Sequence, residues 1–135
     1  MFLIDPKNGL AKIVLETLKK IANGGIHDHV FGGFARYAVD RKWHVPHFEK
    51  MLYDQGQLLM AYTNAYKITR DKFYLEVSNC IFKYLMKDLL HPRGGFYSGE
   101  DADSLPTHES KDKIEGSFYA WSFSEMTKIF KENKN

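Results

Sequence analysis

The fold is decided by residues 58–90, LLMAYTNAYKITRDKFYLEVSNCIFKYLMKDLL, which place apolar side chains at helical spacing on both sides of a short polar link. This pattern predicts one helix over about 48–69 and a second over about 72–90. Asp71 suits the N-cap of the second helix because its carboxylate can accept a backbone N–H. Since only the short link Thr69-Arg70-Asp71 joins the helices, we expect an antiparallel helical hairpin.

Two more helices are expected outside this hairpin. Residues 9–22 carry an apolar stripe at helical spacing, with Asn8 as a plausible N-cap and the pair Gly24-Gly25 as a stop. A fourth helix is predicted from Ser122, because Ser122 and Glu125 have the spacing of a capping box.

Long glycine-rich loops, about 23–47 and 91–121, separate these helices. Loops of this length in a compact domain are usually functional. Both contain a Gly-Gly-aromatic pattern, which indicates a degenerate internal repeat of helical hairpins. Residues 34–39 and 117–121 are short enough to form small β-ribbons. Repeated hairpins must stack on neighbours, so the chain is expected to be part of a larger domain.

Composition narrows the class of protein. The chain has 135 residues, of which 44% are hydrophobic and 27% charged, as in a soluble globular domain. A net charge of +2 is too small to indicate nucleic acid as a partner. No apolar stretch suits a signal peptide or a membrane span, so a cytoplasmic protein without a membrane partner is expected. The single cysteine, Cys80, is expected to be a buried helical residue without a redox role.

Five segments resemble the spermatogenesis-associated protein 20 family, whose bacterial relatives are called YyaL-like. The resemblance covers nearly the whole chain, and the block around residues 45–54 is its most specific part. The matching segments are GGIHDH (24–29), GFARY (33–37), WHVPHFEKMLYDQ (43–55), GGFYS with EDADS (94–98 and 100–104) and EGSFYAW (115–121).

The resemblance implies an all-α fold, an incomplete (α/α)6 toroid of the six-hairpin glycosidase and N-acylglucosamine 2-epimerase type. Residues 1–135 would form the early part of that toroid, and the thioredoxin-like domain that precedes it in the family is absent here. The family's own reaction is not established. The resemblance therefore predicts a carbohydrate-active or sugar-binding protein, with isomerase or hydrolase chemistry in the complete toroid. The alternative is a non-enzymatic scaffold that accompanies the thioredoxin-like domain.

Histidines and carboxylates at the loop–helix junctions supply the candidate chemistry. His27 beside Asp28 could be a general base oriented by a carboxylate, or a histidine that caps loop carbonyls. The acidic run at Asp101 and Asp103 could supply a proton donor and acceptor, or form a solvated turn. The predicted catalytic residues are His27, Asp28, Asp101 and Asp103.

A small polar ligand is expected at the loop rim, and the resemblance implies that this ligand is a sugar. Aromatic rings would stack on it, and carboxylates, Arg and His would bind its hydroxyls. Packing between the loops is the alternative for each aromatic ring, and Arg36 could equally pair with Asp28 or Asp40. The predicted ligand-binding residues are His29, Arg36, Tyr37, Trp43, His47, Glu49, Asp54, Tyr97, Glu100, Tyr119 and Trp121.

Metal and cofactor binding are not predicted. His44 and His47 are three residues apart with Glu49 close behind, but Pro46 disfavours a helix between them.

Six residues are expected to converge at one end of the helices. These are His27, Asp28, Arg36, His47, Glu49 and Asp101. The two charged loops, residues 27–29 and 100–103, are expected to hold the ligand between them.

Overall fold

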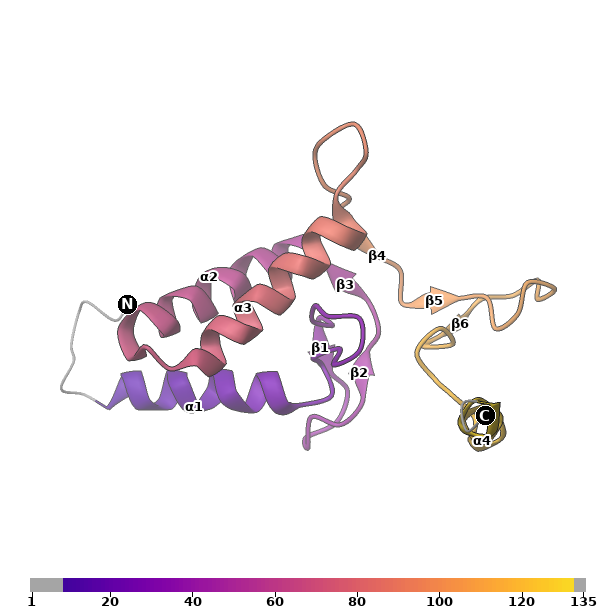
Figure 1. Cartoon of the computed structure of the whole chain (residues 1–135), viewed down its shortest axis with the longest axis horizontal. Coiled ribbons are helices and arrows are strands. Elements are labelled where there is room, and N and C mark those ends of the chain that lie inside the picture. The colour runs from indigo at the N-terminus through magenta and orange to yellow at the C-terminus, as the bar shows by residue number, and fades with distance from the viewer. Residues whose placement is uncertain (1–8, 133–135) are drawn as a thin grey trace. The chain divides into compact units, whose positions relative to one another are not determined.

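The computed structural model of the chain describes residues 9–132 (Figure 1). The chain divides after Asp101 into two compact units, of which residues 9–101 and 102–132 are described. The first unit contains three α-helices and a π-helical turn, and the second contains the fourth α-helix. The helices are α1 (Leu10–Asn23), α2 (Leu52–Thr69), α3 (Lys72–Tyr84), the π-helical η1 (Leu85–Leu89) and α4 (Phe123–Glu132).

The α2–α3 hairpin is confirmed. Arg70 closes α2 in the left-handed conformation, with φ 58°, and its N–H donates to the Tyr66 carbonyl. The Asp71 carboxylate then accepts the Phe73 N–H and caps α3. In Figure 1 the two helices run side by side, with α1 along the hairpin.

Buried tyrosines hold α1 against the hairpin. Tyr62 is fully buried, and its hydroxyl donates to the Leu18 carbonyl over 2.8 Å. The Tyr74 hydroxyl donates to the Leu15 carbonyl over 3.2 Å. A buried tyrosine needs a partner for its hydroxyl, so each of these rings both fills the core and fixes the position of α1. Phe34, which is fully buried, brings the first loop into the same core.

Short strands depart from the all-α expectation. β1 (Tyr37–Ala38) pairs antiparallel with β2 (Pro46–His47), and β3 (Lys50–Met51) pairs antiparallel with β4 (Gly99–Glu100). The β1 strand lies inside the ribbon predicted at 34–39. The helix predicted from residue 48 begins instead at Leu52, because residues 50–51 give their backbone hydrogen bonds to β4.

The second unit is small. Its strands β5 (Asp103–Ser104) and β6 (Ile114–Glu115) pair antiparallel. The ribbon predicted at 117–121 is therefore wrong in position, because the chain turns after Gly116 with the Tyr119 N–H bonded to its carbonyl. The capping box before α4 is confirmed by reciprocal hydrogen bonds between Ser122 and Glu125.

The start of α1 differs from the prediction in its cap. Asn8 lies outside the described residues, and the N-cap position is occupied by Gly9, which has φ 69° and offers no side chain. None of the helices in residues 9–132 combines the length and apolar character that crossing a membrane demands. The four predicted helices are present, whereas closure into a toroid stays a prediction.

Candidate functional site

A cavity of about 430 Å³ lies where the first loop meets α1 and α2. Four predicted ligand-binding residues line it: Arg36 and Tyr37 from the β1 region, Trp43 from the following loop, and Asp54 from the first turn of α2. The rest of its wall consists of Ile21, Ile26, Ala35, Ala38, Asp40, Gln57 and Leu58. The cavity therefore combines charged groups and aromatic rings with an apolar floor.

Asp54 contributes to this cavity a buried polar atom that lacks a hydrogen-bond partner. Its Oδ2 atom is buried and accepts no hydrogen bond within the described residues. Burial raises the pKa of Asp54, and the negative charge of Glu49 adds to the rise while Arg36 opposes it. A buried carboxylate oxygen without a donor is unfavourable unless a proton or a ligand satisfies it. Asp54 is thus suited to accept a ligand hydroxyl or to hold a proton.

Arg36 is held in place by Glu49 rather than by Asp28 or Asp40. Its Nη1 donates to Glu49 Oε2 over 2.6 Å, and the hydrogen bond raises the pKa of Arg36. Its backbone N–H also donates to the Glu49 carbonyl, and its guanidinium lies 5.8 Å from the centre of the Tyr53 ring. A guanidinium has five N–H groups, so most remain available to a ligand.

Tyr37 and His47 form a stacked pair beside the cavity. The β1–β2 register places them opposite each other, and their ring centres are 4.9 Å apart. His47 Nε2 also lies 3.8 Å from Glu49 Oε2. The stack fixes the Tyr37 ring, half of which is exposed, as a rigid wall. His47 thus holds Tyr37 in place, and Glu49 holds Arg36.

Trp43 is presented by a strained loop. It has φ 61°, an unusual conformation for a bulky residue, and its carbonyl accepts the Gly25 N–H over 2.6 Å. A Cβ at Gly25 would lie 1.9 Å from the His44 carbonyl oxygen, so only glycine allows this approach. Both Asp40 oxygens also bind the loop, accepting backbone N–H groups from Lys42, His44 and Val45.

A second polar cluster centres on the buried Lys50. Its Nζ lies 2.8 Å from Asp28 Oδ2 and donates to the Gly32 carbonyl over 2.8 Å. It also lies 4.7 Å from the centre of the Tyr84 ring. Burial alone would raise the pKa of Asp28, but the Lys50 hydrogen bond and the backbone N–H groups of Phe31 and Val30 lower it overall. Asp28 is therefore an ionised residue that fixes the turn after it.

The same cluster connects the two charged loops. Tyr84 donates its hydroxyl to Glu100 Oε2 over 2.7 Å, and its ring packs on Gly33, where a Cβ would approach within 2.6 Å. Asp28, Lys50, Tyr84 and Glu100 thus form one continuous chain of contacts. Protein side chains, rather than open space, join the Asp28 turn to Glu100.

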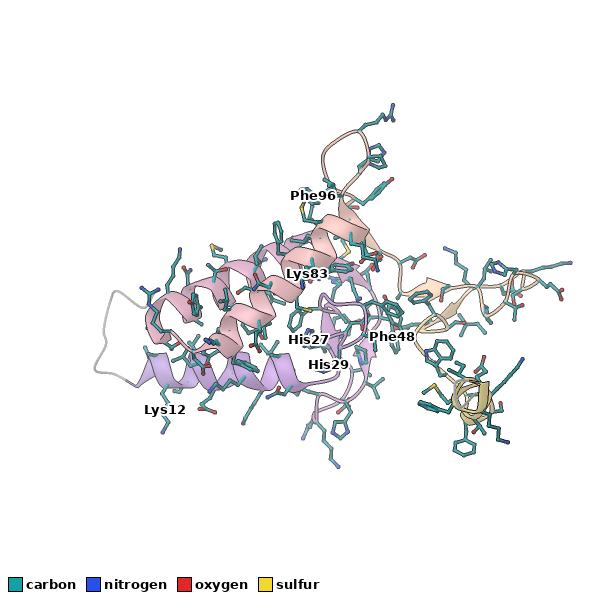
Figure 2. All side chains as sticks on the ribbon, viewed as in Figure 1. Lys12, His27, His29, Phe48, Lys83 and Phe96 are labelled. Carbon is teal, nitrogen blue, oxygen red and sulfur yellow. The ribbon has the colours of Figure 1, made fainter. Side chains whose placement is uncertain are left out.

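His27 makes contacts of a structural kind. Its Nδ1 donates to the Ala22 carbonyl over 2.8 Å, so its Nε2 is free to accept from the Cys80 thiol at 3.5 Å. Burial lowers the pKa of His27, and the ring stacks on Phe34 with centres 4.5 Å apart. In Figure 2 His27 and His29 lie together beyond the end of α1. The capping role considered for His27 matches this geometry.

The other predicted site residues lie outside this cavity. The His29 ring is 4.5 Å from that of His27, and Tyr97 packs edge-on against His91. Asp101 ends the first unit, whereas Asp103, Tyr119 and Trp121 belong to the second. Their roles stay predictions. Across residues 9–132, no three His, Cys, Asp or Glu side chains are grouped so that they could hold a metal ion.

Sequence reasoning missed Lys50, Gln55 and Tyr84. Gln55 is fully buried and clamps Phe34, accepting its N–H over 2.9 Å and donating to its carbonyl over 2.6 Å. Lys50 is only 3% exposed. All three lie in helices or strands, where the apolar pattern predicts a core role for the neighbouring residues but no role for these side chains. The polar residues Lys50 and Gln55, inside the matching segment 43–55, were the available signal.

Comparison with known proteins supports the resemblance. Spermatogenesis-associated protein 20 from Homo sapiens and its counterpart from Mus musculus are each 51% identical to this chain over 121 residues, or 90% of the chain. An uncharacterized protein from Caenorhabditis elegans is 50% identical over 121 residues, or 88% of the chain. The chain spans about 15% of the length of the human and mouse proteins. No family model matches the chain. The sequence matches nevertheless confirm the resemblance, because relatives about 50% identical over about 90% of this chain are named spermatogenesis-associated protein 20.

Proposed function

We propose that this chain contributes a carbohydrate-binding site to a carbohydrate-active protein. The observation that carries the proposal is the unpartnered Oδ2 of Asp54 inside a cavity that Arg36, Tyr37 and Trp43 also line. A sugar presents apolar C–H groups on its ring face and hydroxyl groups around its edge. Carboxylate and guanidinium groups bind the hydroxyls, and aromatic rings cover the face.

The cavity has the size and preorganisation that such a ligand requires. Its volume of about 430 Å³ lies within the range of small-molecule pockets. Glu49 fixes the Arg36 guanidinium and His47 fixes the Tyr37 ring, so little side-chain freedom is lost on binding. Asp54, whose pKa is raised by burial, is the group best placed to exchange a proton with the ligand. Isomerase or hydrolase chemistry in the complete protein would use it.

The experiment is calorimetric titration of the full chain with a panel of neutral monosaccharides, comparing wild type with Asp54→Asn. The amide keeps the shape of the carboxyl group but cannot bind a hydroxyl as a charged acceptor, so affinity should fall about tenfold or more. Asp88→Asn is the matched control, because Asp88 Oδ2 is likewise buried without a hydrogen bond but lies in η1, away from the cavity.

Binding that both variants retain would remove Asp54 from the site. Absence of binding to every sugar by the folded wild type would favour the scaffold alternative. One observation speaks for that alternative: α4 exposes large apolar side chains, with Phe123 89% and Phe130 62% accessible. A partner protein, including another part of a longer chain, would cover such side chains.

A further inference from the structure

Trp43 lines a second hollow, of about 600 Å³, in addition to the cavity described above. It lies between the C-terminal end of α1 and the loop that follows β1. Its wall consists of Thr17, Lys20, Asn23, Gly24, Gly25, Arg41, Lys42, Trp43 and His44. No Asp or Glu belongs to this wall, so the hollow differs in charge from the neighbouring cavity.

Three positive side chains surround the hollow without acidic partners. Lys20, Arg41 and Lys42 are exposed and form no ion pair within the described residues. Lys20 is in the last turn of α1, where it also offsets the negative end of the helix dipole. Arg41 and Lys42 have no such role, since they belong to the loop. Their charges are therefore available to an anionic ligand.

The loop that carries these charges is fixed before any ligand binds. Asp40 accepts three of its backbone N–H groups, of which the Val45 bond contributes most to lowering the pKa of Asp40. Gly25 binds the Trp43 carbonyl, and Trp43 is held at φ 61°. Strained backbone that the surrounding structure maintains is concentrated at functional sites. The one negative charge of Asp40 is directed at the loop backbone and is outnumbered by the three cations.

We propose that this hollow binds the phosphate group of a small phosphorylated ligand, with Arg41 and Lys42 as its main contacts and Trp43 between the phosphate and the neighbouring cavity. Arg and Lys recognise phosphate through charge-assisted hydrogen bonds, and Arg can do so with two parallel bonds. That the rest of the ligand is a sugar rests on the proposed function, whereas the phosphate contact does not.

A small soluble ligand fits these observations better than a polyanionic surface. A nucleic acid or a membrane surface would be attracted by exposed lysines alone. Neither of these partners requires that the lysines line a hollow. The net charge of the whole chain is only +2, so the positive field is local. A concave site next to a cavity with polar groups suits a compact phosphate monoester.

The test is calorimetric titration of the full chain with inorganic phosphate, and then with glucose 6-phosphate and with glucose. The variant is Arg41→Gln/Lys42→Gln. The control is Lys12→Gln/Lys72→Gln, which removes the same charge from exposed lysines of α1 and α3 that line neither hollow. Figure 2 shows Lys12 at the far end of α1 from His27 and His29. Thermal unfolding checks that both variants stay folded.

Saturable binding of inorganic phosphate that weakens about tenfold or more in the loop variant, but not in the control, supports the phosphate site. Equal binding by the two variants, or no saturable binding of inorganic phosphate by the folded wild type, overturns it. Glucose 6-phosphate should bind more tightly than glucose. If inorganic phosphate binds, but glucose 6-phosphate binds no more tightly than inorganic phosphate does, the phosphate site stands and the link to the sugar cavity fails.

Discussion

Replacing Lys50 by Met removes a buried ammonium group while keeping its apolar stem. In the wild type, Lys50 Nζ lies 2.8 Å from Asp28 Oδ2, and the two side chains are 3% and 12% exposed. At that distance, with an effective dielectric constant of about 20, the gross attraction is about 6 kcal/mol. Much of it offsets the desolvation of the two groups. Removing one partner of a buried pair nevertheless costs about 3–5 kcal/mol, because the other charge is left without compensation.

We expect Lys50→Met to lower the free energy of unfolding by about 3 kcal/mol at pH 7, the lower end of that range, because Asp28 keeps the N–H groups of Val30 and Phe31. Urea unfolding at constant m-value measures the change. The matched control is Lys83→Met on the exposed face of α3, which should change stability by less than about 0.5 kcal/mol. A Lys50→Met protein as stable as this control would refute the reasoning.

Two further measurements distinguish the contribution of the ion pair to stability from that of packing. The double variant Lys50→Met/Asp28→Asn should be less destabilised than the sum of the single variants by more than about 1 kcal/mol, since it leaves no unpaired charge. The pKa of Asp28 is lowered in the folded state, so its contribution is present above the ordinary value of 3.8 and is lost as the pH falls through the folded pKa. Lys50→Met should weaken this acid dependence. Strict additivity with an unchanged acid profile would contradict the pairing.

Other predictions follow from single contacts. The pKa of Asp54 is raised in the folded state, so its stabilising contribution is fully present below pH 3.8, the ordinary pKa, and is lost as the pH rises through the folded pKa. Asp54→Asn should therefore raise the melting temperature at pH 7, and this gain should shrink in acid. A destabilised Asp54→Asn would show that the carboxylate has a partner. Gly25→Ala should destabilise by about 1–3 kcal/mol, measured by urea unfolding, because its Cβ would collide with the His44 carbonyl; a neutral result would show that the loop relaxes. The exposed apolar residues of α1 and α4, such as Ile13 and Phe123, should make the chain self-associate, and sedimentation independent of concentration would count against this.

Local signals in the sequence determined the helices and some of their ends. The hairpin link, the Asp71 cap and the Ser122–Glu125 capping box depend on groups within a few residues of one another, so spacing alone reveals them. The boundary that was misplaced, at residue 48 instead of 52, depends on pairing with residues 99–100. No local pattern reports a strand pair that forms across some fifty residues of chain.

The site shows the same division. Residue type and the segments that resemble the family, 33–37 and 43–55, selected Arg36, Tyr37, Trp43 and Asp54 as ligand-binding candidates, because such side chains near glycine-rich loops suit a polar ligand. Only the tertiary structure gathered these four around one cavity and left Asp54 Oδ2 without a partner. It also joined Asp28 to Glu100 through Lys50 and Tyr84. Whether a charged side chain meets a ligand or a neighbour depends on contacts between distant segments, and those are decided by packing in three dimensions rather than by spacing along the chain.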